Sequence, residues 1–226
     1  MVKFTGEKIK EILLNGTEAE VKELTKGDQN TIEILFGLLE GSDWQITERS
    51  ANALQMISKN NDLSKQINKL AKRIDKSNTV FEDRKVALYV ISLRLSPLIS
   101  MPHLVPQLIK LVEDSGENED IKSAACQALG NLGDEKAIDS IIKYLCTPGI
   151  QYNSTRNSIS YSLSKLVSKS KDFGKWVDQL LDIALKNPEN NSRMNAKDVF
   201  IRIQSILIGN NDGQKLNILR EKKVID

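Results

Sequence analysis

The sequence predicts an all-α protein built from short helices, and three observations lead to this class. Apolar residues recur at steps of three and four, as at Leu104, Leu108 and Leu111, and this spacing places them on one face of a helix. No segment shows the sustained alternation of apolar and polar residues that is typical of a strand. Prolines and glycines fall mostly between the apolar stripes, where they act as stops and turns, so the helices should be short.

Turn signals and apolar stripes define the expected helices in order along the chain. Asn15-Gly16 ends the first, Lys26-Gly27-Asp28 separates the second from the third, and Gly41-Ser42-Asp43 precedes the fourth. Further on, Pro148-Gly149 and Asn187-Pro188 mark two later boundaries. The expected ranges are 5–15, 17–26, 29–40, 44–59, 62–75, 82–95, 102–114, 118–132, 134–146, 151–169, 172–186, 190–208 and 212–223.

The segment 121–146 supplies the template of an internal repeat. It begins Ile-Lys-Ser-Ala-Ala-Cys-Gln-Ala-Leu-Gly-Asn-Leu-Gly-Asp and continues into a second apolar stripe, a pattern that resembles the HEAT repeat family. An apolar position of this template recurs at steps of 37, 38, 34 and 37 residues, and a basic position recurs at steps of 38, 34 and 37. The apolar positions are Leu54, Ile91, Leu129, Leu163 and Phe200, and the basic positions are Arg84, Lys122, Arg156 and Arg193.

The resemblance implies a right-handed α-α superhelix, a HEAT-like solenoid of about six helical pairs. It covers nearly the whole chain, which we therefore expect to form a single repeat domain over 1–226. Within that domain we expect a degenerate repeat at 1–40, clearer repeats at 41–208 and a charged C-terminal cap at 209–226. The family's aspartate six residues before the basic position is replaced by Asn78 and Asn187, so a ladder of acid–base hydrogen bonds between repeats should be incomplete.

Composition narrows the class of partner and the compartment. The 226 residues carry 32 Lys and Arg against 30 Asp and Glu, a net charge of +2, which lacks the bias of a chain dedicated to nucleic acid. The 40% of hydrophobic residues is ample for a core and excludes disorder. Two cysteines are typical of a reducing compartment. The charged start lacks the apolar stretch of a signal peptide, so we expect a cytoplasmic protein.

Residues that could support catalysis or bind a metal are sparse. His103 is the only histidine and follows a proline at a helix start, so a histidine-based active site or metal site has no second member. Cys126 and Cys146 have no CxxC partner and are expected to be buried apolar residues. Trp44 and Trp176 lie in different repeats, without the tryptophan-rich motif of HEAT-like DNA glycosylases. We expect no catalytic residue, no cofactor site and no metal site.

The repeat register predicts a partner-binding stripe. If Ile121, Ala125 and Leu129 face the core, then Ser123, Gln127 and Asn131 share an outward face. In the HEAT family the second helix of each pair lines the concave surface, so equivalent positions elsewhere should continue this face. The resemblance therefore implies a concave stripe for partner binding made of Asn52, Met56, Lys85, Tyr89, Leu93, Gln127, Asn131, Tyr161, Lys165 and Arg202, joined by Glu48, Ser123, Asn157, Met194 and Asp198.

A second candidate surface is the basic face of the helix expected at 62–75. Its cations are Lys65, Lys69, Lys72, Arg73 and Lys76, and they lie at helical spacing opposite an apolar stripe. Such a face is usually a solvated helix surface, but it could also contact the phosphates of a nucleic acid.

Three functional hypotheses follow from these patterns. The first is a non-enzymatic HEAT-repeat scaffold or adaptor that binds another protein or peptide through its concave face. The second is a nucleic-acid-associated repeat protein that uses the lysine-rich helix at 62–76. The third is a HEAT-like lyase or an enzyme subunit, a hypothesis that rests on the fold alone and that no individual residue supports. Mixed charge along the stripe, with Glu48 and Asp198 beside Lys85, favours the first.

Overall fold

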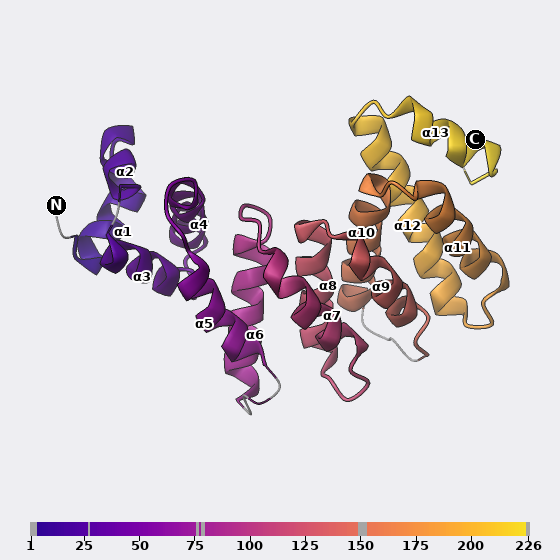
Figure 1. The fold of residues 1–226 in the computed structure, drawn as a ribbon, viewed down its shortest axis with the longest axis horizontal. Helices are drawn as coiled ribbons and strands as arrows, with labels where there is room; N and C mark the ends of the chain where they lie inside the picture. Colours follow the sequence, from indigo (N-terminus) through magenta and orange to yellow (C-terminus); the bar gives the residue numbers. More distant parts are fainter. Residues whose placement is uncertain (1–3, 27, 76, 78–79, 149–152, 225–226) are drawn as a thin grey trace. The chain divides into compact units, whose positions relative to one another are not determined.

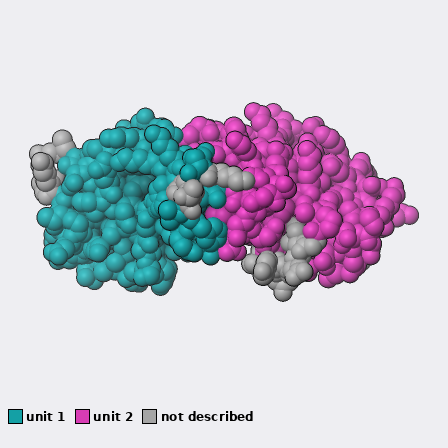
Figure 2. All heavy atoms as spheres, turned by 90° about the horizontal axis from the view of Figure 1, so that it is seen from below, with its two compact units in different colours: residues 1–100 teal, residues 101–226 magenta. Residues whose placement is uncertain are grey.

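The computed structural model describes residues 4–26, 28–75, 77, 80–148 and 153–224. All regular structure in this part of the chain is helical and no strand occurs in it, which confirms the predicted all-α class (Figure 1). The chain divides into two compact units, residues 1–100 and residues 101–226 (Figure 2). A single continuous repeat domain over 1–226 stays a prediction.

The first unit is built from helices that pack as successive pairs. Helix α3 packs on α4 and α5 packs on α6, while α1 contacts both α2 and α4. Their apolar stripes form the core, where Ile9, Leu35 and Leu54 are completely buried. The bounds are α1 Gly6–Asn15, α2 Glu18–Leu24, α3 Gln29–Leu38, α4 Trp44–Ser58, α5 Ser64–Ile74, α6 Phe81–Tyr89 and a π-helical segment η1 Val90–Leu95.

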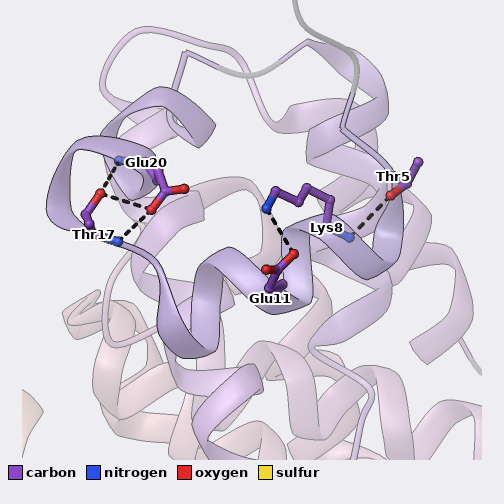
Figure 3. Close-up of polar contacts among 5 residues, drawn as sticks. All are labelled: Thr5, Lys8, Glu11, Thr17 and Glu20. Atoms are coloured by element: carbon purple, nitrogen blue, oxygen red, sulfur yellow. Dashed lines mark hydrogen bonds and ion pairs between the residues drawn. The ribbon is translucent and has the colours of Figure 1, made fainter.

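Polar side chains before the first two helices explain where these helices begin. The Thr5 hydroxyl accepts a hydrogen bond of 3.2 Å from the amide of Lys8, and Lys8 pairs with Glu11 at 2.9 Å (Figure 3). Thr17 and Glu20 form a capping box, in which the Thr17 hydroxyl accepts from the Glu20 amide at 3.3 Å and the Glu20 carboxylate accepts from the Thr17 amide at 2.9 Å. These local bonds satisfy amides that have no partner within the helix.

The helix expected at 82–95 changes its hydrogen bonding partway along. It is α-helical only as far as Tyr89, and then continues as the π-helical segment η1. The amide of Ser96 donates to the carbonyl of Ile91 at 2.8 Å, a step of five residues in place of four. The wider turn rotates every side chain after Tyr89 relative to the positions that an α-helix would give.

The second unit repeats the pairing and stacks its second helices. Helix α7 packs on α8, α9 on α10 and α11 on α12, and α10 lies between α8 and α12, as Figure 1 shows. The bounds are η2 Pro102–Leu104, α7 Val105–Glu113, α8 Glu119–Leu132, η3 Glu135–Ala137, α9 Ile138–Leu145, α10 Asn153–Lys169, α11 Phe173–Lys186, α12 Asn190–Gly209 and α13 Gly213–Glu221.

Small residues let α8 and α10 approach closely. A Cβ atom placed on Gly130 would lie 2.6 Å from the Cα of Ser162, a separation that real Cβ atoms essentially never show. Glycine is therefore required at this crossing by the neighbouring backbone and not by an unusual backbone angle, since the only positive φ among the described glycines is at Gly133, where α8 ends.

Helix α13 covers the end of the second unit. Its Leu219 is completely buried, and the Lys215 ammonium donates to the carbonyl of Ser168 at 2.5 Å. Lys222 pairs with Asp178 on α11. A charged C-terminal cap over 209–226 stays a prediction.

Candidate functional site

Most of the large apolar side chains that remain exposed in the first unit lie on its second helices. On α4, Trp44 is 63% exposed and Met56 is 42% exposed. On α6 and η1, Tyr89 is 45% exposed and Leu93 is 37% exposed. Large apolar groups on a predicted outward stripe are unusual on an ordinary surface and typical of an interface.

A groove in the first unit lies along this stripe. It has a volume of about 290 Å³ and runs between α4 and η1, with the segment after η1 closing it. Its lining combines apolar, acidic, amide and basic groups. The residues are Trp44, Glu48, Ala51, Asn52, Leu93, Arg94, Pro97 and Leu98.

Arg94 supplies the positive charge of the groove, and the π-helical turn places it there. Its guanidinium lies 5.5 Å from the centre of the Tyr89 ring and donates to the Tyr89 hydroxyl at 3.3 Å. Residues five apart do not face each other on an α-helix, so this contact depends on the wider turn of η1. Arg94 Nε is buried and donates to no acceptor, and Arg94 has no ion pair among the described side chains. The cation can therefore receive an acceptor from a ligand.

Apart from Met194, the stripe residues of the second unit are polar or carry a polar group, and several of them bond to one another. Asn131 on α8 accepts hydrogen bonds from Lys165 at 2.8 Å and from the Tyr161 hydroxyl at 3.2 Å, both on α10. Arg202 on α12 donates to Asn157 on α10 at 3.2 Å. These bonds join the three stacked helices across their outer face, so this surface offers fewer unsatisfied groups than the groove of the first unit.

None of the fifteen predicted stripe residues is buried, but the predicted stripe omits two residues that line the groove of the first unit, Trp44 and Arg94. Trp44 continues the four-residue spacing of Glu48, Asn52 and Met56 backward by one step, so the spacing could have identified it. Arg94 carries no such signal, because an α-helical register turns it away from Tyr89.

Three large exposed side chains on α12 form a second apolar row. Met194, Ile201 and Ile208 follow at steps of seven and are 52%, 63% and 57% exposed. Only Met194 belongs to the predicted stripe. Steps of seven keep residues on one side of a helix, so the pattern itself could have identified the other two.

The basic face of α5 is partly neutralised by neighbouring acids. Arg73 pairs with Glu40 at 2.5 Å and with Asp83 at 2.7 Å, and its hydrogen bond to Glu40, together with Asp83, raises the pKa of its guanidinium. Lys69 lies 3.7 Å from Glu33. Lys65 and Lys72 are exposed and form no ion pair with a described residue, and the fifth predicted cation, Lys76, lies outside the described residues.

We expect only weak, shallow salt dependence if the chain is mixed with nucleic acid. Two unpaired lysines release about two counterions, so log K against log salt should have a slope of about −2 or shallower. Fluorescence anisotropy with mixed-sequence DNA and RNA over a salt series measures this slope. A slope near −5 would show that the whole basic face of α5 contacts phosphate.

The single histidine and the two cysteines differ in their exposure to solvent. His103 is exposed at the start of η2, and Cys126 is completely buried, which raises the pKa of its thiol. Cys146 is half-buried, and burial raises its thiol pKa as well. No group of three or more His, Cys, Asp or Glu side chains within the described ranges is arranged to hold a metal ion. No helix formed by the described residues is long and apolar enough to cross a membrane.

Comparisons with known proteins yield structural similarity only. No protein-family model matches the chain, and no curated protein matches it significantly. Among solved structures, the chain is similar to an engineered protein at 18% identity with a TM-score of 0.43, over 90% of this chain and 98% of that one. It is also similar to a designed armadillo repeat protein at 14% identity with a TM-score of 0.39, over 88% of this chain and 92% of that one.

Proposed function

We propose that this chain is a non-enzymatic helical repeat scaffold of the HEAT type that binds another protein through its second helices. The observation that carries the proposal is the exposure of Trp44, Met56, Tyr89 and Leu93 on the second helices of the first unit. Two of them, Trp44 and Leu93, line a groove there. Tryptophan and tyrosine are enriched among the residues that dominate binding energy, because they bury a large area with few rotatable bonds. Two cysteines without a disulfide among the described residues support a cytoplasmic location.

The groove favours a partner segment that combines an apolar side chain with an acidic group. Leu93, Pro97 and Trp44 offer apolar contact area, whereas Arg94 offers donors that no described residue uses fully. A carboxylate bound by a guanidinium that is partly removed from water forms strong charge-assisted hydrogen bonds. Asn52, which lines the same groove, offers an amide to the main chain of an extended segment.

Selection from a random peptide display library against the full chain would test this proposal. We expect enriched peptides that pair an acidic residue with an aromatic or aliphatic one. The Tyr89→Ala, Leu93→Ala double variant should bind a selected peptide at least about thirty times more weakly, because it removes two anchors of the surface. Isothermal titration calorimetry measures the affinity.

Leu185→Ala is the matched control. Leu185 is 68% exposed on α11, outside the stripe, so its removal deletes a similar apolar surface without touching the groove. A double variant that keeps its helical circular dichroism and binds the peptide as tightly as the wild type would refute the proposed surface.

A further inference from the structure

A pocket in the second unit, lined by no stripe residue, contains a buried lysine whose ammonium is left without an acceptor. The pocket has a volume of about 460 Å³ and is bordered by the end of α7, the start of α8 and one side of α9. Lys122 on α8 is only 6% exposed. The pocket is lined by Val112, Glu113, Ser115, Glu119, Lys122, Ser140, Lys143, Tyr144 and Thr147.

The contacts of Lys122 are unusual for a buried cation. Its ammonium lies 5.2 Å from the centre of the Tyr144 ring, which gives a cation–π contact. Among the described residues no oxygen accepts a hydrogen bond from Lys122, and no carboxylate lies within 4.0 Å of it. The ammonium is not itself fully enclosed, so its three donors meet the open space of the pocket, where a ligand can accept from them.

The repeat register does not explain this lysine. At the equivalent positions, Arg84 donates to the carbonyl of Ile74 at 3.4 Å and Arg193 donates to that of Asn187 at 2.6 Å. Thr47 donates to the carbonyl of Trp44 at 2.9 Å. The two arginines donate to a carbonyl at the end of the preceding helix, and Thr47 donates to one in the first turn of its own helix, whereas Lys122 lines the pocket instead.

Two carboxylates stand beside the lysine without neutralising it directly. Glu119 accepts a hydrogen bond from the Tyr144 hydroxyl, and Glu113 accepts one of 2.7 Å from Ser140. Burial and the bond to Glu119 raise the pKa of Tyr144, so its hydroxyl stays protonated and remains a donor. The Tyr144 ring thus has the cation against its face and a carboxylate at its hydroxyl end.

We propose that this pocket binds a small organic acid whose carboxylate pairs with Lys122 and whose neighbouring hydrogen-bond donor faces Glu119 or Glu113. The lining carries two acids and two bases, so a ligand with both an anionic group and a donor matches it better than a simple anion. Free α-amino acids have this chemistry, with the carboxylate as the anionic group and the ammonium as the donor. The volume lies within the range of small-molecule sites, and the walls supply apolar contact from Val112 and Tyr144.

Nuclear magnetic resonance titration of the full chain with each free amino acid would test the inference. We expect at least one amino acid to shift the amides of Ser115, Lys143 and Thr147 with saturation. Amidating its carboxylate, or removing its α-amino group, should weaken binding by about tenfold or more. If no amino acid shifts these amides, or if the amidated form binds equally well, the inference is wrong.

Variants then assign the carboxylate contact to the lysine. Lys122→Met should weaken binding of the free amino acid by about tenfold or more, and amidation should cause no further loss in this variant. Lys110→Met is the matched control, because it removes an exposed lysine of α7 outside the pocket. Undiminished binding by Lys122→Met would overturn the assignment. If this variant does not fold, the comparison of the free and amidated amino acid on the wild-type chain tests the proposal.

Discussion

Replacing Leu129 by alanine is expected to lower the free energy of unfolding of the second unit by about 2 to 5 kcal/mol. Leu129 is completely buried on α8, which packs against both α7 and α10. Removing its three outer carbons loses the free energy of transfer from water and leaves a cavity between helices that cannot collapse fully.

Urea unfolding followed by Trp176 fluorescence would measure this change. Trp176 is buried in α11 of the same unit, and a Trp44→Phe background removes the signal of the first unit. Leu185→Ala is the control, since this exposed leucine should change the stability by no more than about 0.5 kcal/mol. An unchanged urea midpoint for Leu129→Ala would contradict the repeat register on which the stripe depends.

Gly130→Ala is expected to destabilise the second unit by about 1 to 3 kcal/mol, although alanine normally favours a helix over glycine. The new methyl group would lie 2.6 Å from the Cα of Ser162, so α8 and α10 must move apart. Backbone atoms cannot turn away as a flexible side chain can. The movement would weaken the packing along the whole crossing.

The sign of the stability change caused by Gly130→Ala distinguishes an effect of close packing from an effect of helix propensity. Gly174→Ala on α11 meets nothing within 4 Å, so this control should leave the stability unchanged or raise it by up to about 1 kcal/mol. Both variants can be followed by the same Trp176 signal. A stabilising Gly130→Ala substitution would show that the helices do not approach as closely as the structure indicates.

The local signals of the sequence were sufficient to locate the helices. Thirteen ranges were expected and each has a helix, with ends displaced by a few residues at most. Thr17 with Glu20, and Asp43 before Trp44, illustrate why: their caps involve residues two or three positions apart. Likewise, the spacing of Leu104 at the end of η2 and of Leu108 and Leu111 on α7 correctly indicated that these three residues are buried.

The sequence pattern predicted which side chains of the candidate surface face outward, but not which part of that surface forms a groove. Four-residue steps indicated that Met56, Tyr89 and Leu93 face outward, and all three are exposed. The same steps gave no reason to prefer the first unit over the second. That difference arises because Asn131, Tyr161 and Lys165 bond to one another across two helices, whereas the first unit keeps a groove.

The sequence by itself determined the helical class and the outward positions, because each depends on residues within one or two turns, while the pairing of helices was implied by the resemblance to HEAT repeats. Only the tertiary structure decided which groups remain available. The π-helical turn at η1 brings Arg94 beside Tyr89, Glu40 and Asp83 neutralise Arg73, and the walls of α7 and α9 enclose Lys122 without an acceptor. Whether a charged side chain is satisfied depends on neighbours that are distant along the chain, and local periodicity contains no information about them.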